Sequence, residues 1–161
     1  SVVELFTELG VLSEAELEAR NEINHENYKL KIQIESRVAG DLVSNHIIPA
    51  ALDYQGKVIE TVRNMKEIYD GKTFEVNAKP HKAIITEISE RVSKLQSLVE
   101  NMTEARKKAN NIEDVEESSK MYCEEVFPFM DKIRYESDKL EMLVADDLWP
   151  LPKYRELLFT R

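Results

Sequence analysis

The sequence predicts an all-α protein: an elongated antiparallel three-helix bundle or coiled coil with a proline-kinked long first helix and short terminal helices. The 161 residues include 4 glycines and 5 prolines, so turns are few and the elements between them should be long. Hydrophobic residues make up 42% and charged residues 33%, a surface-rich balance typical of helical bundles. Apolar residues recur at spacings of three, four and seven, which marks one face of a helix.

The chain opens with a short amphipathic helix and continues with a much longer one. The short helix should end at Gly10, and its apolar face consists of Val2, Val3, Leu5, Phe6 and Leu9. Ser13 then begins the long helix, because Glu16 lies three residues later and completes a capping box.

The long first helix should reach about Tyr69 and should not be straight. Pro49 lies inside it, lacks the backbone N–H and disfavours helical geometry in the residue before it. We therefore expect a kink or break near Asn45–Ile48, which leaves two limbs at about 14–47 and 50–69.

A loop at residues 70–79 should separate the long helix from the next one. At most a short extended piece is expected within it, at Thr73–Val76. Pro80 then restarts a helix at a favoured first-turn position. This second helix has the cleanest heptad spacing in the chain, carried by Ile85, Ile88, Val92, Leu95, Val99, Met102 and Ala109.

A third helix of similar length follows a turn at Asn110 and Asn111 and forms an antiparallel hairpin with the second. Asp114 with Glu117 predicts a capping box at its start, and Pro128 predicts a kink inside it. The long first helix is the expected third partner of the shared apolar seam. The third helix contributes to that seam Val115, Tyr122, Val126, Phe129, Ile133, Leu140 and Val144.

The net charge of −9 is distributed unevenly. Residues 1–36 carry 8 acidic against 3 basic side chains, residues 113–147 carry 12 against 4, and residues 37–112 carry 10 against 12. Acidic helix faces are ordinarily just solvated, and this charge argues against nucleic acid as a main partner.

The single cysteine, Cys123, rules out an internal disulfide and suits a reducing compartment. No partner is spaced to activate the thiol, so we expect it to be buried or half-buried. No signal peptide is visible and no apolar run approaches the length of a membrane span, so we expect a cytoplasmic protein with no membrane partner. The chain begins on a serine inside a helical pattern, and we expect a piece cut from a longer chain.

Candidate metal and catalytic residues are few. Glu22 and His25 have the Glu-x-x-His spacing of di-iron bundles, but such sites need a second motif, and His46 and His81 both lack a Glu three residues before them. A solvated helix face is therefore the expected role of that pair. His46 lies just before Pro49, where an Asn or His can satisfy a carbonyl that the proline frees; the alternative is a contact with a neighbouring domain. There is no glycine-rich phosphate loop, and we expect no catalytic, cofactor-binding or metal-binding residue.

The C-terminal stretch LWPLPKYRELLF, residues 148–159, is the most distinctive part of the chain. Two prolines one residue apart stop a helix there, and a stiff apolar tail is costly to leave in water. Rigid aromatic and leucine side chains bury much apolar area at low entropic cost. We expect a docking anchor formed by Trp149, Pro150, Pro152, Tyr154, Leu157, Leu158 and Phe159.

Four blocks in order resemble one family. They are GVLSEAELEAR at Gly10–Arg20, IQIESRVAGDLVSNHIIPAALDYQ at Ile32–Gln55, EARKKANNIED at Glu104–Asp114, and IRYESDKLEMLVADDLWPLPKYRELLF at Ile133–Phe159. Together they are similar to the C-terminal helical region of type III glutamine synthetases. The resemblance covers essentially the whole chain, 1–161, and is most specific at NHIIPAA and at the tail.

The resemblance implies a parent ligase of nitrogen metabolism that joins ammonia to glutamate with ATP through a γ-glutamyl phosphate. It also implies divalent metal (Mg), a large cytoplasmic homo-oligomer, and a catalytic domain upstream whose motifs are absent here. The segment itself would then be a structural and oligomerisation region, without catalysis, that contacts the catalytic domain and neighbouring subunits. The alternatives are a free-standing helical adaptor that grips an unrelated partner and, less favoured, a di-iron bundle.

Overall fold

The computed structural model describes residues 2–159, apart from the side chains of residues 2, 154 and 155. The all-α prediction is confirmed: no β-strand occurs in the described range. The helices are α1 (Val2–Glu8), α2 (Glu14–Leu42), α3 (Ile48–Ile68), α4 (Gly71–Asn110), α5 (Val115–Met121), α6 (Phe127–Leu143) and α7 (Tyr154–Leu158), with π-helical turns at Val43–Ile47 and Tyr122–Val126.

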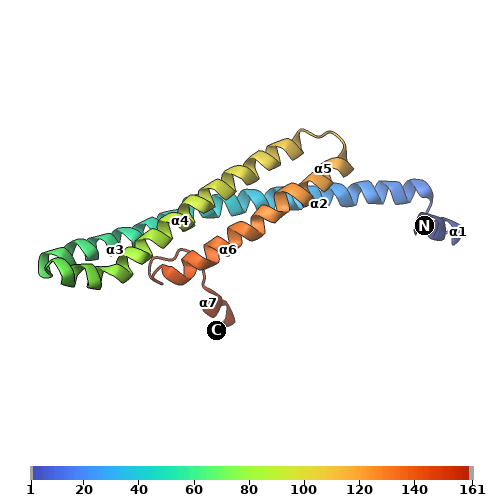
Figure 1. Ribbon diagram of the computed structural model, residues 1–161. Coiled ribbons are helices and arrows are strands. Elements are labelled where there is room, and N and C mark those ends of the chain that lie inside the picture. Colours follow the sequence, from blue (N-terminus) through green and yellow to red (C-terminus); the bar gives the residue numbers. More distant parts are fainter. Residues whose placement is uncertain (1, 160–161) are drawn as a thin grey trace.

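Three helical rods lie side by side (Figure 1). The first is α2, a π turn and α3; the second is α4; the third is α5, a π turn and α6. The α3–α4 and α4–α6 pairs share the largest helix contacts, and α5 packs on α2. At one end, the hairpin of α3 and α4 extends past α6, and at the other, α2 extends past α5 towards α1 (Figure 1). Among the described residues, no helix is long and apolar enough to cross a membrane.

The core follows the predicted heptad seams. In α4 the fully or nearly buried seam residues are Ile88, Val92, Leu95, Met102 and Ala109, and in the third rod they are Tyr122, Val126, Ile133, Leu140 and Val144. The first rod supplies Ile32, Val43, Ile47, Ile48 and Ala51 to the same cluster. Burying one such branched or aromatic side chain contributes about 1.5–3 kcal/mol, so this seam is the main source of stability.

Two of the prolines within the rods, Pro49 and Pro128, follow a π turn and do not end the rod. The π turn Val43–Ile47 ends two residues before Pro49, and Tyr122–Val126 ends two residues before Pro128. The N–H of Ile48 donates to the carbonyl of Val43, five residues back, as it does in a π-helix. Widening the turn accommodates a residue without an N–H, and each proline then begins the following α-helix in a favoured early position. His46 is exposed beside the first turn.

The predicted loop at 70–79 is wrong, and so is the extended piece at Thr73–Val76. The interruption is confined to Tyr69 and Asp70, and α4 starts at Gly71, so Pro80 lies inside the helix instead of at its start. Contacts between side chains hold these extra turns: Lys82 forms an ion pair with Glu75 at 3.0 Å, and its ammonium lies 5.1 Å from the centre of the Phe74 ring. Packing contributes as well, since Ala78 is fully buried and Phe74 is half-buried in the same stretch.

The helix ends have the expected chemistry. The capping box at Ser13 is confirmed, since its hydroxyl accepts from the Glu16 N–H and the Glu16 carboxylate accepts from the Ser13 N–H. Asp114 supplies one half of the second predicted box, because its carboxylate accepts from the Glu117 N–H at 2.7 Å. Gly10 closes α1 at φ +63°, a left-handed conformation that glycine adopts at little cost.

Candidate interaction surfaces

The first half of the tail folds back onto the chain's own bundle. After α6 ends, the N–H groups of Leu148 and Trp149 both donate to the carbonyl of Ala145, which forms a tight turn. Trp149 is 9% exposed and belongs to the core cluster, and Leu148 and Leu151 pack against that cluster. The indole N–H has no hydrogen-bond partner, so the side chain of Trp149 is held by packing alone. Of the predicted docking residues, Trp149 is thus already largely covered within one chain.

Lys153 fastens the tail to the end of α6. Its ammonium donates to the carbonyls of Glu141 at 3.0 Å and Val144 at 3.3 Å, and to the carboxylate of Asp146 at 2.6 Å. The last carbonyls of a helix have no partner within the helix and attract cations. Lys153 therefore caps α6, and in doing so fixes the point from which α7 leaves the bundle.

Beyond this clamp the tail is uncovered. Leu157, Leu158 and Phe159 are 60%, 77% and 80% exposed, and α7 projects away from the rods (Figure 1). We call these three residues the tail end. Pro150 and Pro152 are exposed as well, whereas the side chain of Tyr154 lies outside the described residues. The docking role of these residues stays a prediction. The three residues of the tail end are the strongest candidates for it, because their apolar side chains are exposed.

A second uncovered apolar surface lies at the far tip of the α3–α4 hairpin. A hollow of about 910 Å³ opens there, which we call the tip hollow, and it is lined by Lys66, Gly71, Lys72, Phe74, Glu75 and Val76. Val76 is 72% exposed, and nearby Ile68 is 76% exposed. The loop predicted at residues 70–79 gives no hint of this surface, which forms only because these residues are helical.

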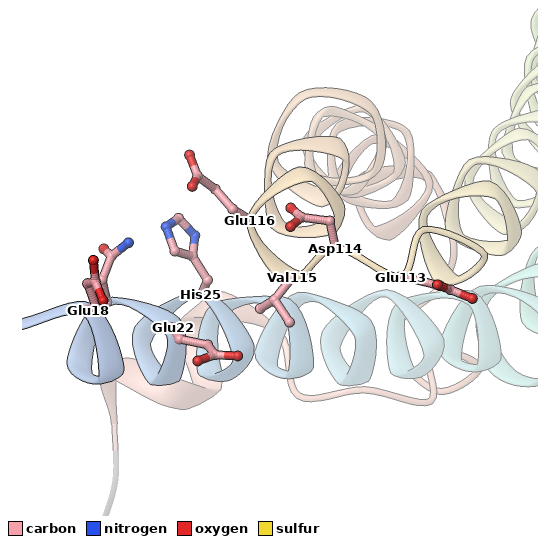
Figure 2. A pocket seen from close by; sticks show the side chains of 8 residues that line it. Glu18, Glu22, His25, Glu113, Asp114, Val115 and Glu116 are labelled. Carbon is pink, nitrogen blue, oxygen red and sulfur yellow. The ribbon is translucent and has the colours of Figure 1, made fainter. Parts of the chain in front are cut away.

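An acidic pocket lies between α2 and the start of α5. It is lined by Glu18, Asn21, Glu22, His25, Glu113, Asp114, Val115 and Glu116. His25 and Glu116 lie on the same side, whereas Glu22 and Glu113 point away from them (Figure 2). The His25 ring is 3.1 Å from the Ser119 hydroxyl, and Glu116 forms an ion pair with Lys120 at 2.7 Å. Across the described residues, no three His, Cys, Asp or Glu side chains are placed to hold a metal ion.

Cys123 is exposed, so the expectation of a buried or half-buried thiol is wrong. It lies in the second π turn, directly after the fully buried Tyr122, and consecutive residues of a helix face directions about 100° apart. The neighbouring Tyr28 hydroxyl is hydrogen-bonded to Cys123, and this bond, with partial burial, raises the pKa of Tyr28 to about 12.

An ion network centred on one buried carboxylate joins α4 to α6, and the sequence analysis does not predict it. Glu136 is 3% exposed, accepts from Arg91 at 2.7 Å, and pairs with Lys94. Arg91 also binds Glu87 at 2.7 Å. Burial raises the pKa of the Glu136 carboxyl, but the hydrogen bonds from Lys94 and Arg91 outweigh it and leave the pKa below its ordinary value. The network joins α6 to α4, which is a structural role.

Comparison with known proteins agrees with this description. A family model described as the glutamine synthetase C-terminal domain matches residues 1–66. The glutamine synthetase of Bacteroides fragilis (strain YCH46) is 49% identical over 151 residues, which is 94% of this chain and 21% of the relative. The type-3 glutamine synthetase of Dictyostelium discoideum is 31% identical over 99% of this chain and 22% of the relative.

A third relative, the glutamine synthetase of Butyrivibrio fibrisolvens, is 26% identical over 98% of this chain and 22% of its own length. The chain therefore spans about a fifth of the length of the curated relatives it matches. The chain is an all-helical bundle that aligns almost end to end with parts of three glutamine synthetases. It belongs to the family of glutamine synthetase C-terminal domains.

Proposed function

We propose that this chain is the structural and oligomerisation region of a type III glutamine synthetase. The parent enzyme would join ammonia to L-glutamate with ATP and divalent metal, in the cytoplasm, and the groups for that chemistry would lie in its catalytic domain. The observation that carries the proposal is the tail: one half is fastened to the bundle by Trp149 and Lys153, and the other presents three exposed apolar side chains.

This division suits a docking element. A segment whose base is fixed loses little further freedom when it binds, so more of the contact energy appears as affinity. The partners we propose are the catalytic domain of the same chain and neighbouring subunits of a homo-oligomer. The relatives are about five times longer than this chain, which is consistent with a larger body for such a region to pack on.

The proposal makes a direct claim about activity. The isolated chain should show no γ-glutamyl transferase activity when it is assayed with ATP or ADP and Mg²⁺ or Mn²⁺. The protein concentration should be one at which the activity of an intact glutamine synthetase is readily measured. The longer Bacteroides fragilis relative, assayed in parallel, is the positive control. Turnover by the isolated chain would overturn the structural role.

A further inference from the structure

A polar hollow of about 310 Å³ opens between α2 and α4, beside the π turn Val43–Ile47, and we call it the arginine hollow. Its wall carries two positive side chains, one negative side chain and several hydroxyl and amide groups. These are Arg37 and Asp41 of α2, Ser44 and Asn45 of the π turn, and Thr103 and Arg106 of α4. Pockets that hold small molecules have volumes from about 300 Å³ upward, so the hollow is large enough for a small ligand.

The two guanidinium groups approach one point of the bundle from different helices. Burial raises the pKa of the Tyr122 phenol, whereas the positive charges of Arg106 and Arg37 both act to lower it. Both charges are therefore close to the same buried hydroxyl. Like charges repel each other, and the repulsion is stronger near a protein interior than in open water. An anion placed between the two arginines would relieve it.

Neither arginine has an anionic partner among the residues that the structure describes. In that part of the chain, Arg37 and Arg106 form no ion pair and no hydrogen bond. Asp41 follows Arg37 by four residues, a spacing that suits an ion pair on a helix, but its carboxylate accepts from the Asn45 amide instead. Arg106 is also half-buried, and a charge that is partly withdrawn from water is costly without a partner.

We propose that the arginine hollow binds a small oxyanion, the carboxylate or phosphate group of a metabolite, between Arg37 and Arg106. A guanidinium presents a planar fork of N–H donors that matches the oxygens of either group. The hydroxyls of Thr103 and Ser44 are further donors, since within the described residues neither makes a hydrogen bond. Two guanidiniums against the one carboxylate of Asp41 leave the lining positive, in a chain whose net charge is −9.

This site is separate from the proposed docking role of the tail, so either can fail without the other. An NMR titration of the chain at neutral pH and low ionic strength tests it. The probes are sodium phosphate and sodium succinate, and sodium chloride at matched ionic strength is the reference. We expect saturable shifts of the side-chain Nε–H signals of Arg37 and Arg106 with at least one oxyanion, at a dissociation constant of about 1 mM or below, and none with chloride. The probe that binds more tightly identifies the source of the group, a phosphorylated or a carboxylic metabolite.

Substitutions in the lining should change the affinity in opposite directions. Arg37→Gln and Arg106→Gln should each raise the dissociation constant about tenfold or more, because each removes a charged hydrogen-bond donor. Asp41→Asn should lower it, since the one negative charge of the lining is lost. Arg63→Gln removes the same charge from an exposed position on α3, outside the lining, and as the matched control should leave the affinity unchanged. Arg37 is exposed, so its variant should keep the fold, as circular dichroism can verify.

Several results would overturn the site. They are the absence of saturable shifts with both oxyanions, equal shifts with chloride, and an equal loss of affinity in Arg63→Gln. Weaker binding by Asp41→Asn would show that the carboxylate helps to hold the ligand, which contradicts an anion site. If only one of the two arginine variants binds more weakly, the oxyanion is not held between α2 and α4, and the proposal fails.

Discussion

Removing Arg91 should destabilise the protein more than removing the charge of Glu136, although the two side chains form one ion pair. The reason is their unequal burial: the side chain of Glu136 is 4% exposed, that of Arg91 is 21% exposed and that of Lys94 is 62% exposed. Arg91→Met keeps much of the apolar stem but leaves a buried carboxylate with one remaining cation. Stranding a buried charge altogether costs about 3–5 kcal/mol, so with Lys94 still paired we expect about 2–3 kcal/mol.

Glu136→Gln should cost about 1 kcal/mol, close to the value of one hydrogen bond. The amide oxygen still accepts from a cation, Arg91 keeps its bond to Glu87, and the exposed Lys94 returns to water. Urea unfolding at neutral pH, followed by far-UV circular dichroism, gives both free energies of unfolding. If Glu136→Gln costs as much as Arg91→Met, burial of the carboxylate does not control the network and the reasoning fails.

The same network predicts a pH dependence. The folded pKa of Glu136 lies below its ordinary value of 4.5, so the stabilisation is fully present above that value and is lost as the pH falls through the lower folded pKa. The native chain and Glu136→Gln should therefore converge in stability at pH values below 4.5 and differ by a constant amount at neutral pH. A gap that widens on acidification would contradict this sign.

Three further substitutions test other parts of the bundle. Trp149→Ala should lower the free energy of unfolding by about 3–5 kcal/mol in thermal or urea unfolding, because the side chain is in the core. Trp149→Phe should lower it clearly less, since the indole N–H makes no hydrogen bond that the substitution would remove. Equal losses for the two variants would show that packing is not the cause. Gly40→Ala should raise stability by about 0.5–1 kcal/mol, as an added methyl meets Val99 and Met102 at ordinary contact distances of 3.6 and 3.8 Å. Lys153→Met should lower stability by about 1–2 kcal/mol and speed hydrogen exchange in the last turn of α6; unchanged exchange would deny the capping role.

The helices that carry an apolar seam could be predicted from the sequence, because the spacing of their apolar residues follows from which side chains pack in the core. Ile88, Leu95, Tyr122 and Leu140 were placed in the core by spacing alone, and each is buried. The capping residue Ser13 was equally readable, since its box is a local hydrogen-bond pattern.

The first turns of α4 were not readable, for a physical reason. Asp70 and Gly71 favour a turn and Pro80 favours a helix start, so local preference predicts the start of the helix nine residues late, at Pro80 instead of Gly71. The first turns bury only Ala78 fully and Phe74 in part, and they are held in addition by contacts of Lys82 with Glu75 and Phe74. Such contacts give no periodic signal.

The functional surfaces were recovered in part. The tail was singled out from its composition, but composition could not separate Trp149, which enters the core, from Phe159, which is exposed. Glu136 lies three residues after Ile133 and four before Leu140, at seam spacing, but a charged side chain predicts exposure unless its partners are known. Those partners, Arg91 and Lys94, are on another helix, and a single sequence does not show which residues of two helices meet.

The wide turn before Pro49 also sets the direction in which the far end of the molecule faces. A π turn holds about one residue more than an α-helical turn, so the helix beyond it is offset by about 100° around the rod axis from the continuation of an unbroken α-helix. The helix α3 shares that offset, and so does the tip hollow at its far end. Deleting one residue from Val43–Ile47 would keep both limbs helical and yet swing the hollow, with the buried face of α3, to another side of the rod. One extra residue in the π turn thus determines the direction in which a surface more than twenty residues away faces.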